Sequence, residues 1–474
     1  MNVVALARRR RAFAALFIAL FALSQTLLWV AYYAGGSKLL IGDEAGYQAT
    51  ALAIMGGGAW MPSTIWPPLQ PLLLAAIYAV AGAHVLAAQL VQTALFIGCA
   101  ALLRDLWRRI GGSVAAANTA AALFLLNPAT AAYAHWLWPE IPHLFLLLAT
   151  LCLLARSPSR PAAFVAGACA GFALLAKSLL SGFWPLFMLA FVRRVQPYLL
   201  IGPAALFTLA LALVTAPALV HGWRTTGRPM IADSSVYNLW IGLTDEWRSD
   251  YVADMGGTTL PAFIASGATP QQRNAAYLEK IHALVTERGV VRVLADQLGR
   301  QYFRLFNAKT PLVSQLPGPA CAGYLSVYHT SPWLTRTLAM ANDVFHASIL
   351  IAAAFGVACW RRRPDRMTLL IALLFAYQLA LLLLIHVKAR FLLPMLPFLC
   401  GLAGSFITAL PQLGGAGAAS AAMLFPSAER NDTGNAAPTA MHLTPARLVV
   451  GALLAAALLF LAFGGPALDH LCAG

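Results

Sequence analysis

The chain has 474 residues, of which 60% are hydrophobic and 10% are charged, and its formal net charge is +15. Apolar runs of about 20 residues recur along it, and the mean hydropathy is +0.72, which excludes a water-soluble globular protein. The runs are continuous and do not alternate apolar with polar residues, so an outer-membrane barrel is excluded too, and we predict an all-α, polytopic transmembrane helical bundle.

The positive charge is concentrated in short loops between the apolar runs. Such clusters are typical of cytoplasmic loops, and this distribution argues against a nucleic-acid-binding protein. The clusters lie at residues 8–11, 104–109, 156–160, 193–194 and 361–366. The first cluster would also suit a signal peptide, but the apolar stretch that follows is longer than a signal peptide needs, which favours an uncleaved first span.

With the N-terminus in the cytoplasm, the clusters predict about 11 spans. These are 12–33, 84–103, 113–134, 139–155, 161–177, 179–192, 196–220, 340–360, 367–386, 391–410 and 446–466. The segments 161–177 and 179–192 are short for full crossings, so we expect one of them to be tilted, broken or fused with its neighbour.

Three parts follow from this topology. Residues 1–220 are expected to form an N-terminal transmembrane module with a first outer loop at 34–83, and residues 221–338 a periplasmic loop with amphipathic helices. Residues 339–474 form C-terminal transmembrane helices with a flexible cytoplasmic linker at 411–445, which is rich in Gly, Ala and Ser.

Two outer segments are expected to lie on the membrane surface. The stretch WPPLQPLLLAAIYAVAG, from Trp66 to Gly82, is predicted to be an interfacial helix that begins at Pro67 and Pro68. Residues 271–306 have helical spacing and predict two amphipathic helices that are separated at Gly289.

Charged residues from distant parts of the chain are expected to meet at the outer face. They are Asp43, Glu44, Glu140, Lys177, Arg224, Arg228, Lys388 and Arg390. Carboxylates beside cations at a membrane surface suit a substrate that carries phosphate on a lipid tail. The cations would bind the phosphate, and a carboxylate would activate an acceptor hydroxyl.

Each of these residues also has a purely structural interpretation. Adjacent acids after a span are common in solvated loops, Glu140 suits the first turn of a helix, and Lys177 can extend its amine to the membrane surface. In the same way, Lys388 and Arg390 would be anchors at the membrane interface. Arg224 and Arg228 would be charges in a solvated loop.

A divalent metal is an open alternative as a cofactor, because His135, His143 and His386 are expected near the same surface. Most of the seven cysteines fall in predicted spans as small packing residues. Only Cys321 and Cys472 are expected to face an oxidising compartment together, which leaves a disulfide between them open.

Five segments, in this order, resemble the GT-C class of membrane glycosyltransferases, in particular the protein O-mannosyltransferase and lipid A aminoarabinose transferase group. They are GDEAGY, the WPP helix with its PLLLA run, PEIPHLFLLLA, GRP followed by YNLWIG, and KARFLLPMLPFL. Together they extend from about Asp43 to Leu399, which is most of the chain.

The resemblance implies an inverting enzyme that takes a sugar from a polyprenyl-phosphate donor, such as an undecaprenyl phosphate sugar. The acceptor would be an envelope lipid, glycan or protein at the periplasmic face of the inner membrane. By position, Asp43 matches the catalytic aspartate, Glu44 its neighbour and Glu140 the second acid. The cations expected to contact the phosphate are Lys177, Lys388 and Arg390. The single modest outer segment differs from many members of the class, so the acceptor type does not carry over.

The main rival function is a membrane transporter or flippase for a lipid-linked sugar or phosphate, and a catalytically inactive lipid-binding scaffold is a third. Transporters commonly repeat a pair of broken spans and place their charges at the midplane. This sequence has no such repeat, and its charges collect at one face, which favours the enzyme.

Overall fold

The computed structural model describes residues 3–33, 37–40, 43–61, 65–156, 159–192, 200–244, 255–300, 302–307, 331–360, 365–410 and 443–464. Throughout these ranges the chain is helical or irregular and contains no β-strand. The proposed disulfide between Cys321 and Cys472, the arginine clusters at 193–194 and 361–363, and the linker from 411 to 442 lie outside the described residues.

The N-terminal half contains α1 (Val3–Tyr33), α2 (Asp43–Met55), α3 (Leu69–Ala81), α4 (Val85–Arg109), α5 (Val114–Leu126), α6 (Pro128–Tyr133), α7 (Glu140–Ala155), α8 (Arg160–Ala176), η2 (Trp184–Phe191) and α9 (Ile201–Thr226). The middle segment contains α10 (Ser234–Leu243), α11 (Met255–Ala265), α12 (Pro270–Arg288), α13 (Val290–Arg300) and η4 (Tyr302–Phe306). The remainder contains α14 (Pro332–Cys359), α15 (Arg366–Leu381), η5 (Ala389–Leu392), α16 (Leu396–Ala409) and α18 (Pro445–Leu459).

Many helices begin where the sequence supplies a capping side chain. Ser113, Ser159 and Ser331 precede α5, α8 and α14, and each hydroxyl accepts a backbone N–H from three residues further on. At α12, Thr269 and Gln272 form a reciprocal capping box. These contacts satisfy N–H groups that the first helical turn leaves without partners.

Five described helices are long and apolar enough to cross a membrane, namely α1, α4, α9, α14 and α18 with the turn that follows it. Six further apolar helices are shorter. The predicted span at 113–134 is divided at Asn127 and Pro128, the one at 179–192 consists of short 3-10 turns, and the one at 367–386 ends at Leu381. The count of about 11 spans therefore stays a prediction, whereas the all-α membrane fold is confirmed.

Contacts at the two ends of α4 define two ends of the helical bundle. The Tyr33 hydroxyl, at the end of α1, donates to Gln89 near the start of α4 at 2.6 Å, and we call this end the site end. At the opposite end, Asp105 of α4 pairs with Arg109 at 2.8 Å and with Arg156, after α7, at 3.5 Å. Loops that the sequence analysis assigned to one side of the membrane therefore meet.

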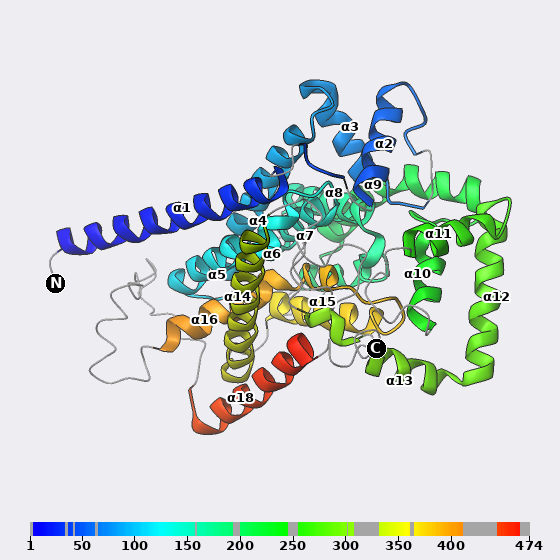
Figure 1. The fold of residues 1–474 in the computed structure, drawn as a ribbon. Helices are drawn as coiled ribbons and strands as arrows, with labels where there is room; N and C mark the ends of the chain where they lie inside the picture. Colours follow the sequence, from blue (N-terminus) through cyan, green and yellow to red (C-terminus); the bar gives the residue numbers. More distant parts are fainter. Residues whose placement is uncertain are drawn as a thin grey trace.

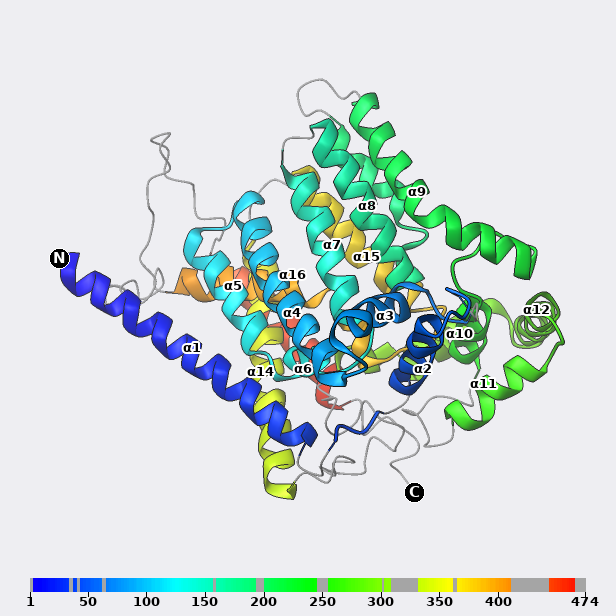
Figure 2. The same cartoon turned by 90° about the horizontal axis from the view of Figure 1, so that it is seen from above.

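The middle segment has a small core of its own. Tyr237 and Ile241 of α10 pack with Phe263 of α11 and with Tyr277 and Ile281 of α12. Figures 1 and 2 show α10, α11 and α12 together at one side of the molecule, while the N-terminal half of α1 extends from the other side. The two helices predicted within residues 271–306 are present as α12 and α13, and they are separated at Gly289. α3 lies within the predicted segment from Trp66 to Gly82, and its place at the membrane interface stays a prediction.

Close helix packing in the bundle depends on small residues. α8 lies along α9, and a Cβ added at Gly167 of α8 would overlap the carbonyl oxygen of Phe207 on α9. Small residues let the backbones of membrane helices approach closely, which increases the van der Waals contact between them.

We expect Gly167→Ala to lower the melting temperature of the detergent-solubilised protein, because α8 and α9 must separate to admit the methyl group. Overpacking of this kind costs about 1–3 kcal/mol. Gly299→Ala is the control, since a Cβ at that exposed position of α13 meets no atom within 4 Å. Equal melting temperatures for both variants would contradict the close packing of α8 on α9.

Candidate active site

The site is built on the loop between α6 and α7, which three buried glutamines hold in place. Gln89 donates to the carbonyl of residue 135 at 2.9 Å, Gln92 to that of residue 136 at 2.5 Å, and Gln70 to that of residue 137 at 2.9 Å. Three consecutive carbonyl groups are thus satisfied by side chains of α3 and α4. The loop enters α7 in a fixed path, and Glu140 is the first residue of that helix.

A buried ion pair fixes the start of α2 to the same loop. Lys38 Nζ lies 2.5 Å from Glu44 Oε1, and neither side chain is exposed. The same carboxylate oxygen accepts the backbone N–H of Leu137 at 2.8 Å. Burial lowers the pKa of Lys38, although the negative charge of Glu44 opposes that shift. Glu44 therefore anchors α2 to the loop.

Asp43 points to a different partner from its neighbour. Arg390 lies 3.3 Å from the Asp43 carboxylate and 3.7 Å from that of Glu140, while Lys177 lies 3.0 Å from Glu140. The guanidinium carbon of Arg390 is 4.8 Å from the centroid of the Trp138 ring, within range of a cation–π contact. Residues from α2, α7, the end of α8 and η5 therefore form one charged cluster.

The basic loop between α15 and α16 is supported by α10, the segment that contains YNLWIG. The backbone N–H of His386 donates to the Asn238 carbonyl at 3.3 Å. A Cβ at Gly242 would overlap the backbone of Ile385, so only glycine permits this approach. Lys388, in the same loop, is buried, and its burial, together with the charge of Arg390, lowers its pKa well below the ordinary value.

The carboxylates of the site differ in their access to solvent. The Asp43 side chain is 27% exposed, compared with 2% for Glu140 and none for Glu44. Asp43 is therefore the carboxylate of the three with the most access to solvent, whereas Glu140 and Glu44 are enclosed beside their cationic partners.

Other predicted residues are not brought into the cluster by any described contact. Arg224, in the last turn of α9, and Arg228, just after it, are exposed. The His135 ring nitrogen Nε2 lies 3.0 Å from Gln25, and the His143 ring bonds to a backbone carbonyl at 2.9 Å. Within the described residues, no three His, Cys, Asp or Glu side chains come together as metal ligands.

Several neighbours of the cluster were not predicted from the sequence. Tyr47 and Tyr133 are buried within electrostatic reach of Glu140 and Arg390. Tyr47 follows Asp43 by four residues, and this spacing places both on one face of α2. The spacing could therefore have identified Tyr47 from the sequence. No local pattern indicates that Lys38 pairs with Glu44, because this pair depends on the path of the chain.

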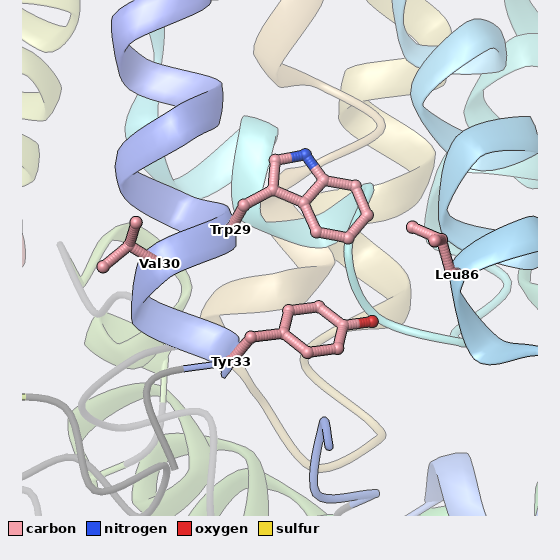
Figure 3. Close-up of a pocket in the computed structure, with 4 residues that line it drawn as sticks. All are labelled: Trp29, Val30, Tyr33 and Leu86. Atoms are coloured by element: carbon pink, nitrogen blue, oxygen red, sulfur yellow. The ribbon is translucent and has the colours of Figure 1, made fainter. Parts of the chain in front are cut away.

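A separate apolar groove of about 560 Å³ lies between α1 and α4. Figure 3 shows Trp29 and Tyr33 projecting from α1 toward Leu86 of α4. The Trp29 ring also packs edge-on against His135 at 4.7 Å, so the groove borders the loop that carries the site.

Lys38→Met is expected to destabilise the protein strongly, because it leaves the Glu44 carboxylate buried without its cation. Breaking a buried pair in this way costs about 3–5 kcal/mol. The matched control is Arg109→Met, which removes an ion pair whose side chains are 34% and 35% exposed, where about 1 kcal/mol or less is expected. Thermal denaturation in detergent compares the two, and similar losses would show that the Lys38 pair is not buried as described.

No family model matches the sequence, and no curated protein matches it. The chain is similar to ArnT from Cupriavidus metallidurans bound to undecaprenyl phosphate, with 14% identity and a TM-score of 0.38 over 85% of this chain and 78% of that one. It is also similar to the Archaeoglobus fulgidus oligosaccharyltransferase in the apo form, with 14% identity, a TM-score of 0.48, and 95% and 56% of the two chains covered. For AglB from the same organism, in complex with an inhibitory peptide and a dolichol-phosphate, the identity is 12% and the TM-score 0.45.

The chain spans about half the length of the two archaeal chains. At this level of similarity no residue role carries over from these proteins, and the role of each residue is argued from its own contacts in this chain.

Proposed function

We propose that the chain is an inverting glycosyltransferase that moves a hexose or pentose from a polyprenyl-phosphate donor to an envelope lipid, glycan or protein. The reaction would take place at the periplasmic face of the inner membrane. The observation that carries the proposal is the cluster in which Arg390 lies between Asp43 and Glu140, with Lys177 bound to Glu140.

The charge of the cluster suits this donor. Asp43 and Glu140 supply two negative charges, and Lys177, Lys388 and Arg390 supply three positive ones when Lys388 is protonated. The excess of one positive charge matches the single negative charge of a sugar phosphodiester. Burial and the charge of Arg390 lower the pKa of Lys388. A phosphate beside Lys388 would oppose that shift and favour the protonated amine.

The same cations would stabilise the leaving group. As the bond between the anomeric carbon and the phosphate oxygen breaks, its electron pair stays on that oxygen, and the phosphate gains negative charge. Cations placed where charge develops lower the barrier more than they strengthen binding of the ground state. Arg390 is suited to this role because its planar guanidinium binds phosphate through two parallel hydrogen bonds.

Asp43 would act as the general base. The acceptor oxygen attacks the anomeric carbon while its proton passes to the Asp43 carboxylate, and a single displacement of this kind inverts the anomeric configuration. A hydroxyl group has a pKa far above 7, so a base beside it accelerates attack by about 100- to 10,000-fold. The donor phosphate would compete with Asp43 for Arg390, which would release the carboxylate when the donor binds.

We expect Asp43→Asn to lower the rate of sugar transfer by about 100-fold or more, because asparagine keeps the size of the side chain but removes its basicity. The assay measures transfer from polyprenyl-phosphate sugars by the purified protein, and donor binding should remain close to that of the wild type. Asp105→Asn, at the opposite end of the bundle, serves as the control.

Wild-type transfer by Asp43→Asn would refute the proposed base. Movement of the intact lipid-linked sugar across a vesicle membrane, without loss of sugar from the lipid, would instead favour the transporter or flippase.

A further inference from the structure

A buried histidine beside the cluster has no role in the mechanism above. His386 lies in the loop between α15 and α16, with 8% of its surface exposed. Neither of its ring nitrogens has a hydrogen-bond partner among the residues that the structure describes. A buried polar group without a partner destabilises a fold, so this ring is a candidate for contact with a ligand.

Contacts on several sides hold His386 in place. Besides the bond from its backbone to α10, its ring lies edge-on to Phe391, with 5.6 Å between the centroids. Gln297 of α13 donates to the carbonyl groups of Leu382 and Ile385 at 3.2 and 2.7 Å. The backbone is therefore held at the ring and just before it, and the ring itself packs on Phe391, which gives the imidazole a defined position.

The surroundings of the ring are positively charged. Arg390 and the buried Arg304 of η4 both act on it electrostatically, and Lys388 is two residues further along the loop. Burial and these arginines lower the pKa of His386 to about 3, so the ring is neutral at physiological pH. A neutral imidazole has one N–H donor and one acceptor nitrogen.

We infer that His386 is a donor-binding residue whose ring N–H donates a hydrogen bond to a phosphate oxygen of the lipid-linked donor, beside Lys388 and Arg390. This inference rests on the proposed function. The neutral ring adds a hydrogen bond to the anion without adding a further positive charge to a cluster that already balances one phosphate. The loop between α15 and α16 thereby supplies three phosphate contacts, at positions 386, 388 and 390.

The test compares the binding of undecaprenyl phosphate and of undecaprenol, which lacks the phosphate, to the full chain in nanodiscs. We expect His386→Phe to weaken the binding of undecaprenyl phosphate by about 10- to 100-fold, the effect of losing one hydrogen bond to a charged group. The affinity for undecaprenol should not change. His386→Asn retains an N–H donor and should recover part of the loss.

His346→Phe is the matched control. This histidine is also buried, but its Nε2 already bonds to the Phe306 carbonyl at 2.8 Å, so its replacement should leave both affinities unchanged. If His386→Phe does not fold, the same binding measurements are made with His386→Leu, which also lacks the N–H donor and has a smaller side chain.

Unchanged binding of undecaprenyl phosphate by the folded variant would overturn the inference. An equal loss for both lipids would also overturn it, because it would show a packing role. Since this assay involves no sugar transfer, failure of the proposed glycosyltransferase activity would appear separately, as a wild-type protein that binds the phosphate lipid but transfers no sugar.

Discussion

The site depends on one arginine. Arg390 lies between Asp43 of α2 and Glu140 of α7, and the Asp43 carboxylate is 347 residues distant in the sequence. Carboxylates and cations that are largely removed from water must form ion pairs, because a buried charge without a partner destabilises the folded protein. This requirement brings the start of α2, the start of α7 and the loop between α15 and α16 to one place.

The surrounding structure keeps these charges in position. Buried glutamines hold the loop before α7, the Lys38 and Glu44 pair holds the start of α2, and α10 holds the basic loop through the close approach at Gly242. None of these supports involves Arg390 directly. A phosphate that replaced Asp43 as the partner of Arg390 would therefore leave the framework of the site intact.

Much of the fold was predictable from local patterns. Apolar runs indicated the helices, and the break at Gly289 was predicted from the spacing on either side. The charged residues were identified because ionisable groups are uncommon in so apolar a chain. Asp43 and Glu44 were expected to face different partners, because adjacent residues on a helix point in different directions. The partner of Glu44, Lys38, could not be predicted, since it is set by the path of the chain. The exposed positions of Arg224 and Arg228 are likewise decided by tertiary packing at the end of α9.

The most direct measurement is an electron cryo-microscopy structure of the full chain in a nanodisc with undecaprenyl phosphate. We expect the phosphate oxygens to lie about 3 Å from the nitrogen atoms of Arg390 and Lys388, at hydrogen-bonding distance. The Asp43 carboxylate should then be separated from Arg390 and open to solvent. A phosphate bound elsewhere, for example at Arg224 and Arg228, with Arg390 still paired to Asp43 and Glu140, would contradict this account of the site.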